Sequence, residues 1–213
     1  MQYPVLIRHL GQQPYQTIYQ AMQDFTDKRN AGTVDEIWVL EHFPVYTIGM
    51  AGKMEYLLNT GNIPIVKTDR GGQVTYHGLG QLIVYVLMDL KRQRGSIKKL
   101  VYKLEQAIID CLSILGLSAH RRPKAPGIYV DQRKISALGL RMRRACIYHG
   151  LSINVNMDLS PFKGIYPCGD KNLEVTQLRD LGVNNTVKSL AKQLMPHLLR
   201  HLNYSEISTS GEV

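Results

Sequence analysis

Cys168 is the residue of this chain whose position is hardest to explain by packing alone. It stands between Pro167 and Gly169, in a stretch without apolar periodicity. A cysteine becomes a nucleophile in partly exposed, electropositive surroundings, because these favour the thiolate. Lys163 and Lys171 supply positive charge nearby in the sequence. Cys168 is therefore a candidate nucleophile, and an incidental loop cysteine is the alternative.

Lys134 is a second residue that could take part in chemistry. It begins a segment, residues 134–139, that otherwise holds small and apolar residues. Most lysines at strand ends are simply solvated. A lysine buried beside a thiol differs, since it can stabilise the thiolate, and burial can lower its own pKa until it acts as a general base. His77 and His149 are the other acid–base candidates. The sequence alone does not show that these groups meet in space.

The stretch from Asp69 to Gln81, DRGGQVTYHGLGQ, has four glycines within ten residues. Glycines allow tight turns and a close approach of backbone to a ligand. The order of residues matches neither the P-loop nor the dinucleotide-binding pattern, which argues against an ATP or NAD site. The stretch therefore predicts a ligand loop between two strands, with an ordinary glycine-rich connection as the alternative.

Helices that would support these residues follow from apolar residues at helical spacing. The clearest has Ser96 as its N-cap and ends at Gly116. Cys111 lies on its apolar stripe, and a free cysteine there is predicted to be a core residue. Other helices are expected at residues 13–30, at residues 173–181 and from about residue 185, with a kink at Pro196.

Strands follow from β-branched runs and from alternating apolar and polar residues. They are expected at residues 36–41, 63–66, 82–87, 127–131, 134–139, 140–149 and 151–156. The residues from 158 to 171, which hold Cys168, contain prolines and glycines and are predicted to be a loop. The pattern predicts an α/β (α+β) fold in which helices flank a mixed, largely antiparallel sheet. We expect one domain over residues 1–204 and a disordered tail at residues 205–213.

The composition restricts the classes of function. The chain has 213 residues, 44% hydrophobic and 20% charged, which is typical of a soluble globular protein. No apolar run is long enough to span a bilayer, and the N-terminus lacks the apolar core of a signal peptide, so we expect a cytoplasmic protein. Three cysteines and seven scattered histidines form neither a disulfide framework nor a zinc pattern. A net charge of +9 favours acidic proteins, nucleic acid or anionic membranes as partners, without choosing among them.

Several motifs taken together resemble one family, the octanoyltransferase (lipoyl(octanoyl) transferase) family of bacterial lipoate biosynthesis. These motifs are Arg70 to Gln81 (RGGQVTYHGLGQ), Lys134 to Gly139 (KISALG), His149 to Leu151 followed by Asn154 to Leu159, and Pro167 to Gly169. The residues from Glu41 to Gly49 resemble the family's earlier active-site strand and loop. Asp170 departs from the pattern, since many members have an aromatic residue there.

The resemblance implies a fold shared with biotin and lipoate protein ligases. It implies transfer of an octanoyl group from octanoyl-acyl carrier protein to one lysine of a lipoyl domain, in the E2 subunits of 2-oxoacid dehydrogenases or in the glycine cleavage H protein. The thioester donor is already activated, so no cofactor, ATP or metal is expected, and a monomer is plausible. An acidic acyl carrier also suits the positive charge, and changes at Arg141, Arg143 or Arg144 would then weaken carrier binding in a salt-sensitive way.

The resemblance also implies roles for residues. Cys168 becomes the acyl-thioester nucleophile and Lys134 its acid–base partner, with His149 in a supporting role. The acyl site is expected to be lined by three segments of the chain: Arg70, Gly71, Gly72, Gln73, Val74, Thr75, Tyr76 and His77; Ala137, Leu138 and Gly139; Gly150, Leu151 and Ser152.

Two other functions stay open. An ATP-dependent lipoate or biotin ligase on the same fold would share the arginine–glycine stretch and an important lysine, but adenylate chemistry needs no nucleophilic cysteine such as Cys168. A basic nucleic-acid-binding module would explain the net charge. The sequence contains no helix-turn-helix, RNA-binding or zinc-finger signature, so we expect no nucleic-acid partner.

Overall fold

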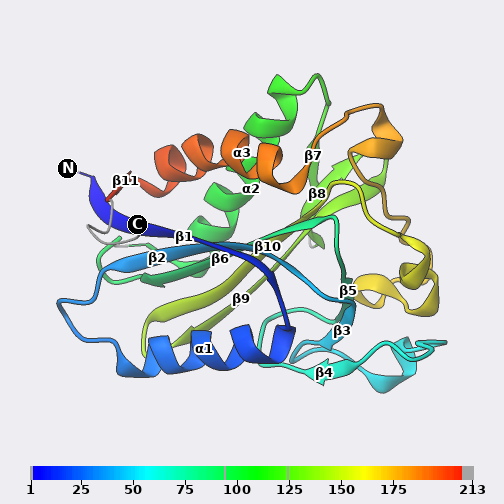
Figure 1. The fold of residues 1–213 in the computed structure, drawn as a ribbon, viewed down its shortest axis with the longest axis horizontal. Coiled ribbons are helices and arrows are strands. Elements are labelled where there is room, and N and C mark those ends of the chain that lie inside the picture. Colours follow the sequence, from blue (N-terminus) through cyan, green and yellow to red (C-terminus); the bar gives the residue numbers. More distant parts are fainter. Residues whose placement is uncertain (1, 94, 124, 208–213) are drawn as a thin grey trace.

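A large mixed sheet forms the centre of the molecule (Figure 1). The computed structural model describes residues 2–93, 95–123 and 125–207. Its strands are β1 (Tyr3–Gln13), β2 (Asp35–His42), β6 (Gln81–Asp89), β7 (His120–Arg122), β8 (Ala125–Val130), β9 (Arg133–Arg143), β10 (Cys146–Asn154) and β11 (Tyr204–Glu206). They lie in the order β11-β1-β2-β6-β10-β9-β8-β7. Strand β1 runs parallel to β2 and β11, and the other neighbours pair antiparallel, as predicted.

Helices cover both faces of this sheet. Helices α2 (Ile97–Ile114) and α3 (Val187–Leu202) lie on one face, and α1 (Tyr15–Lys28) lies on the other (Figure 1). Strand β2 contributes apolar side chains to the packing on both faces. Its Ile37 and Val39 join the core under α2 and α3, whereas Trp38 and Leu40 join the cluster under α1. Because side chains alternate along a strand, a continuous apolar run is what a sheet covered on both faces requires.

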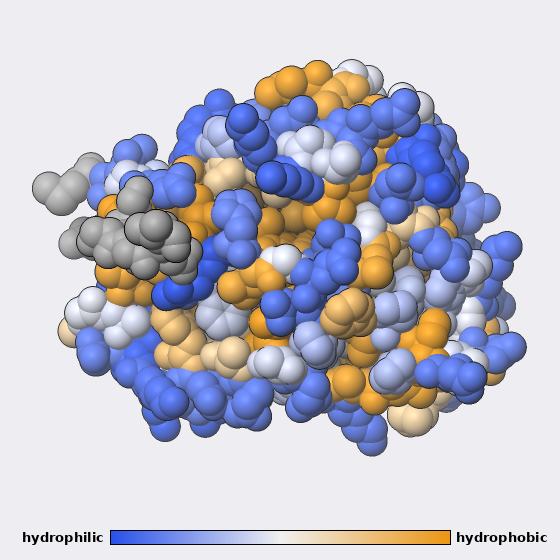
Figure 2. Space-filling model, in the orientation of Figure 1, coloured by the Kyte–Doolittle hydropathy of each residue, from blue (hydrophilic) through white to orange (hydrophobic). Residues whose placement is uncertain are grey.

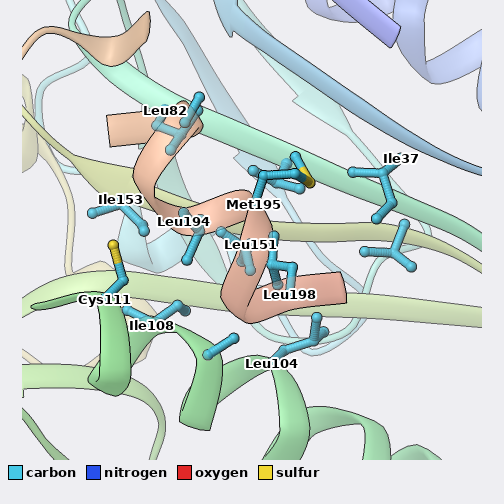
Figure 3. Close-up of a cluster of buried hydrophobic side chains, with 14 of the residues drawn as sticks. Ile37, Leu82, Leu104, Ile108, Cys111, Leu151, Ile153, Leu194, Met195 and Leu198 are labelled. Carbon is cyan, nitrogen blue, oxygen red and sulfur yellow. The ribbon is translucent and has the colours of Figure 1, made fainter. Parts of the chain in front are cut away.

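Helix α2 matches its prediction closely. The Ser96 side chain accepts a hydrogen bond from the Lys99 N–H at 3.3 Å, which is the N-cap expected from the sequence. Cys111 is 1% exposed and packs in the core together with Leu104 and Ile108 of the same helix (Figure 3). It is therefore the structural cysteine that its helical spacing predicted.

A second, small sheet carries the glycine-rich stretch. Its strands are β3 (Val45–Ile48), β4 (Ile65–Lys67) and β5 (Val74–His77), in the order β4-β3-β5. The backbone N–H of Gly71 donates to the Leu140 carbonyl at 2.9 Å and so ties this stretch to β9. The stretch predicted as a loop thus contains a strand, β5, and joins the two sheets.

The strands predicted at residues 140–149 and 151–156 were wrong in their boundaries. Strand β9 continues to Arg143, and β10 already begins at Cys146. The turn between them is Arg144-Ala145, and both residues have positive φ, 51° and 63°. Such a turn normally contains glycine or asparagine, and neither residue is present here to indicate it.

Two further predictions need correction, and β1 lies where no strand was predicted. Residues 173–181 form no α-helix, because Val175 bridges to Lys134 of β9 and a single 3₁₀ turn follows at Arg179–Leu181. The tail was expected to be disordered from residue 205, but Ser205 and Glu206 pair with β1 in β11. Residues 208–213 of that tail lie outside the described residues.

One face of the molecule has an apolar groove. Figure 2 shows apolar side chains gathered in a hollow near its centre, where α3 approaches β1. Ile7, Ala191 and Met195 contribute to its lining. The groove shares no lining residue with the cavity at Cys168, so the two are separate. Within the described ranges, no helix is long and apolar enough to cross a membrane.

Candidate active site

A cavity of about 60 Å³ lies where the glycine-rich stretch, β9, β10 and the Cys168 loop meet. Its lining comes from segments that are far apart in the sequence, so the two sheets must be in place before it exists. The lining residues are Tyr15, Arg70, Gly72, Gln73, Val74, Thr75, His77, Ile83, Tyr85, Ala137, Leu138, Gly139, His149, Gly150, Leu151, Ser152 and Cys168.

Most residues expected at the acyl site line this cavity, and Gly71 and Tyr76 do not. Side chains alternate along β5, so Tyr76 points away from the face that carries Thr75 and His77. The Tyr76 ring packs 5.5 Å from Phe162 in the core of the small sheet. Gly71 serves the structure through its bond to β9. In this structure neither residue contributes to the lining of the cavity.

Cys168 and Lys134 meet at the edge of the cavity. The Nζ atom of Lys134 lies 3.1 Å from Cys168 Sγ and 2.9 Å from the carbonyl oxygen of Pro126. Lys134 is 5% exposed, and its Nζ also lies 5.3 Å from the centre of the Tyr129 ring. A buried ammonium so close to a thiol favours the thiolate.

Burial was expected to lower the pKa of Lys134, but the net direction is the reverse. Burial does act to lower this pKa, and it is the largest single influence. The negative charge of Cys168 and the neighbouring Tyr129 act in the other direction and raise the pKa of Lys134 above its ordinary value. Lys134 is therefore a charged ammonium beside Cys168, and not a neutral amine.

Helix α2 and strand β8 hold Lys134 in place. Glu105 of α2 is buried and accepts a hydrogen bond from the Gly127 N–H at 3.0 Å. A side chain at Gly127 would place its Cβ 2.8 Å from Lys134 Cε. Glycine at this position therefore leaves room for the lysine, while Glu105 fixes the segment whose Pro126 carbonyl binds Nζ.

The backbone at Cys168 is unusual for a residue with a side chain. Cys168 has φ 55°, and Gly169 follows with φ 75°. A Cβ at Gly169 would lie 1.9 Å from Gln73 Oε1, so the loop and the glycine-rich stretch pack without space for a side chain. Residues held in sparsely populated conformations cluster at functional sites, where the surrounding structure maintains them.

Gly139 of β9 and Gly150 of β10, which line the cavity, also allow neighbouring segments to pack closely. A Cβ at Gly150 would meet the Val84 carbonyl oxygen at 2.0 Å, and one at Gly139 would meet the Gly71 carbonyl oxygen at 2.9 Å. These glycines therefore let protein backbone approach protein backbone. The cavity wall depends on them because they bring neighbouring segments together.

Arg70 is a buried cation beside the cavity. It is 8% exposed, and its guanidinium donates to the carbonyl oxygens of Thr47, Gly71 and Gln73 and to the Thr47 hydroxyl. Burial lowers the pKa of Arg70 from its ordinary value, although arginine stays charged in proteins. Five hydrogen bonds to neutral oxygens hold this charge in one orientation.

Two histidines near the cavity are neutral and fixed. Burial lowers the pKa of His77 to about 3 and that of His42 to about 4. His77 Nδ1 is 2.7 Å from Gln81 Oε1, and Gln81 Nε2 donates to Asn154 Oδ1 at 2.9 Å. The amide oxygen only accepts, so Nδ1 carries the hydrogen. His77 is therefore an anchored part of the wall, and the structure does not favour its predicted role as an acid–base group near neutral pH.

His149 lies in β10 with φ 63°, and its Nε2 is 3.1 Å from an Asp69 carboxylate oxygen. It lines the cavity from a part of β10 that is distant from Cys168.

The sequence did not indicate Tyr15, Ile83 and Tyr85 as lining residues of the cavity. Tyr15 gave only the signal of a helix core position, and the other two gave that of a buried strand. Within the described ranges, no group of three or more His, Cys, Asp or Glu side chains is placed to hold a metal ion.

The chain is similar to known proteins over most of its length. Residues 14–199 match the model of the lipoyl protein ligase A/B catalytic domain. An octanoyltransferase from Chromobacterium violaceum is 55% identical, over 95% of this chain and 98% of that protein. Octanoyltransferases from Shewanella oneidensis and from an Escherichia coli strain are 51% and 50% identical, over 94% and 93% of this chain and 93% of each relative.

Solved structures share the fold at lower identity. A bi-partite lipoate protein ligase from Thermoplasma acidophilum superposes with a TM-score of 0.69 at 17% identity, covering 97% of this chain and 87% of that one. Lipoate-protein ligase A bound with ATP gives 0.70 at 16% identity, covering 98% and 90%. Biotin protein ligase from Aquifex aeolicus gives 0.54 at 13% identity, covering 95% and 69%. These likenesses confirm the predicted ligase-like fold.

Proposed function

This chain belongs to the octanoyltransferases, within the family of lipoyl protein ligase A/B catalytic domains, and from that premise we propose its substrates and mechanism. The donor is octanoyl-acyl carrier protein. The acceptor is one lysine of a lipoyl domain, in the E2 subunit of a 2-oxoacid dehydrogenase or in the glycine cleavage H protein. The octanoyl group passes through a thioester on Cys168, and Lys134 moves the protons.

The observation that carries the proposal is the contact between Lys134 Nζ and Cys168 Sγ, 3.1 Å apart at the edge of the cavity. A thiolate is the nucleophilic form of cysteine, and a buried ammonium stabilises it. In the first step the thiolate attacks the carbonyl carbon of the carrier thioester. The new carbon–sulfur bond forms on Cys168, the bond to the carrier sulfur breaks, and Lys134 gives a proton to the leaving carrier thiolate.

The second step uses the change in charge that the first step produces. Once Cys168 is acylated, its negative charge is gone, while the burial that lowers the pKa of Lys134 remains. Lys134 then stays neutral and serves as a base. The acceptor amine attacks the thioester, Lys134 takes the proton that the amine loses, and Cys168 leaves as a thiolate. The ammonium–thiolate pair is restored, so the cycle balances without ATP.

The cavity suits the acyl chain. It begins beside Cys168 and runs along the glycines of β9 and β10, and most of its lining is apolar or backbone. Covalent catalysis of this kind divides one difficult transfer into two easier ones. The buried Arg70 is a second cation that interacts with Cys168, and its charge favours the thiolate as well.

Intact-protein mass spectrometry tests the proposal. Wild-type protein mixed with octanoyl-acyl carrier protein, without an acceptor, is expected to gain the mass of one octanoyl group. Cys168→Ser is expected to gain none, whereas Cys146→Ser, which alters a free cysteine outside the cavity, gains the same mass as the wild type. No adduct on the wild type under conditions in which transfer proceeds would remove the covalent route.

The same experiment separates this function from that of an ATP-dependent ligase. The fold is shared with a lipoate-protein ligase that was solved with ATP, and that likeness alone keeps the ligase under consideration. A ligase would acylate the lipoyl domain from free octanoate only when ATP is added. We expect transfer from octanoyl-acyl carrier protein without ATP, and no product from octanoate and ATP.

A further inference from the structure

The cavity has an inner end that lies away from the nucleophile. Ser152 and Ala137 pair across β10 and β9, and both also line the adjoining cavity of about 20 Å³ that Cys168 shares. His149 and Leu140 pair three residues further along the same ladder. Three residues of a strand span about 10 Å, which is comparable with an extended acyl chain of medium length. His149 therefore lies where the end of such a chain would arrive.

His149 presents a hydrogen-bond acceptor at this inner end. Its Nε2 lies 3.1 Å from the Asp69 carboxylate, which also accepts from the Tyr148 hydroxyl. A carboxylate only accepts, so Nε2 carries the hydrogen. Burial lowers the pKa of His149, so the ring is neutral and Nδ1 offers its lone pair. That Nδ1 is buried and has no hydrogen-bond partner among the described residues.

Tyr15 presents a donor on the same wall. It is 4% exposed, and burial raises the pKa of its hydroxyl, which therefore stays protonated. The hydroxyl is near Thr68 but makes no hydrogen bond of ordinary geometry with any described residue. Tyr15 and His149 flank Tyr19, at ring-centroid distances of 6.0 Å and 5.5 Å.

A buried polar group without a hydrogen-bond partner destabilises the folded protein. A wall that faced only a terminal methyl group would have no use for a donor and an acceptor. We propose that the inner end of the cavity binds a hydroxyl group at the end of an acyl chain, so that medium-length ω-hydroxyacyl groups are a further class of substrate. The terminal oxygen accepts from the Tyr15 hydroxyl, and its hydrogen is donated to His149 Nδ1. The inference rests on the proposed function, because the group enters as a thioester at Cys168.

The test compares two donors of equal size, octanoyl- and 7-hydroxyheptanoyl-acyl carrier protein. The second has a terminal hydroxyl where the first has a terminal methyl group. Transfer to a lipoyl domain gives kcat/KM for each, and their ratio is the readout. An apolar pocket would disfavour the hydroxyl by about 100-fold. We expect the wild-type ratio of hydroxy to unsubstituted chain to stay above about one tenth, because the donor and acceptor compensate for the buried hydroxyl.

Tyr15→Phe removes the donor. We expect its ratio to fall at least tenfold below that of the wild type, the loss of about one hydrogen bond. Both donors are measured on the same enzyme, so a general loss of activity cancels. Tyr102→Phe is the matched control, because Tyr102 is 56% exposed and lies outside the cavity, and it should keep the wild-type ratio.

The outcomes separate the two claims. Failure to transfer octanoyl itself would overturn the proposed function. Normal octanoyl transfer with a wild-type ratio near one hundredth would overturn this inference alone. A wild-type ratio above one tenth that Tyr15→Phe leaves unchanged would overturn the assignment of the hydroxyl to Tyr15, and with it the inference.

Discussion

Lys134 and Cys168 are 34 positions apart in the sequence, and their Nζ and Sγ atoms are 3.1 Å apart. Neither residue is brought there by its own segment alone. Lys134 is the second residue of β9, and its backbone N–H and carbonyl bond to Glu174 and Thr176, which follow the Cys168 loop. These hydrogen bonds hold the Cys168 loop next to Lys134. The contact between the two side chains therefore depends on hydrogen bonds between segments that are far apart in the sequence.

Lys134→Met tests what the ammonium does. Methionine keeps an unbranched apolar chain and removes the charge, so the thiolate of Cys168 loses its nearest cation. We expect the iodoacetamide reactivity of Cys168, followed by peptide mass spectrometry, to require higher pH than in the wild type. Octanoyl-adduct formation at pH 7 should slow by about 10²- to 10⁴-fold, the range typical of a lost acid–base group.

Lys171→Met is the control for this charge, since Lys171 is exposed and makes no contact with the thiol in the described structure. In this control, iodoacetamide should alkylate Cys168 over the same pH range as in the wild type. Coinciding alkylation curves for wild type and Lys134→Met would remove the ammonium–thiolate pair from the mechanism.

Gly80 and Gly182 form a matched pair for testing how tightly the glycine-rich stretch is packed. Both have positive φ, 86° and 79°. A Cβ at Gly182 would meet nothing within 4 Å, whereas one at Gly80 would lie 2.0 Å from the Asn156 carbonyl oxygen. Gly182→Ala is therefore expected to cost about 1 kcal/mol of unfolding free energy, the price of the backbone conformation. Gly80→Ala should cost at least 2 kcal/mol more, because backbone must move.

Urea unfolding of both variants gives these two free energies. Equal losses would mean that the turn at Gly80 relaxes freely, and that its contact with residue 156 does not fix the start of β6.

Local signals explain what the sequence predicted well. Helix α2 was predicted almost to the residue, because its cap at Ser96, its apolar stripe and its stop at Gly116 all lie within the element. Strand β1 was missed because it pairs along only part of its length with β11 and is partly exposed, so it lacks the regular alternation of a half-buried strand. The turn at Arg144-Ala145 was missed because its partner strands, and not its residues, impose positive φ.

The site was predictable in part for the same reason. Cys168 and Lys134 were singled out by their local surroundings, and their meeting in space could only be expected from the resemblance. The helical spacing of Tyr15 predicted only an ordinary core position of a helix. Its place on the cavity wall follows from the packing of α1 across the sheet, which no local pattern encodes. Conversely, Tyr76 shares a motif with Thr75 and His77, but the alternation of β5 turns it to the other face.

His42 makes stability depend on pH in a predictable direction. Burial lowers the pKa of His42 to about 4, whereas histidine in an unfolded chain titrates near 6.5. As the pH falls below 6.5, His42 becomes protonated in the unfolded state but stays neutral in the folded state. The free energy of unfolding therefore decreases until the pH reaches about 4. At about 1.4 kcal/mol per pH unit, the loss between pH 7.5 and pH 5 amounts to about 2 kcal/mol.

His42→Gln isolates this contribution. The amide can donate to the Gln13 carbonyl and accept from the Tyr85 hydroxyl, as the ring does, but it does not titrate. Urea unfolding of both proteins at pH 7.5 and pH 5 should show a smaller pH-dependent loss in the variant, by about 2 kcal/mol. Other titrating groups are common to both proteins and cancel. An identical loss in the two proteins would contradict the neutral, buried assignment.

Two basic regions compete as the docking site for an acidic acyl carrier, and geometry favours the one beside Cys168. Arg141 and Arg143 lie at the far end of β9 and Arg144 in the turn that follows, and the ten residues from Lys134 to Arg143 span about 30 Å. Arg143 is also 3.2 Å from Asp27. Lys163 and Lys171, in contrast, line a groove that includes Pro167, the neighbour of the nucleophile.

Charge reversal at the two regions distinguishes them. We expect Lys163→Glu to raise KM for octanoyl-acyl carrier protein by about threefold to tenfold at low ionic strength, and 0.5 M salt to remove most of the difference, because such surface attractions are screened. Arg144→Glu makes the same change of charge far from the thiol and should alter KM much less. Reactivity of Cys168 with iodoacetamide checks that neither variant disturbs the nucleophile. A larger rise in KM for Arg144→Glu than for Lys163→Glu would contradict this assignment. It would place the carrier at the turn between β9 and β10, and its thioester would then have to extend along the whole of β9 to reach Cys168.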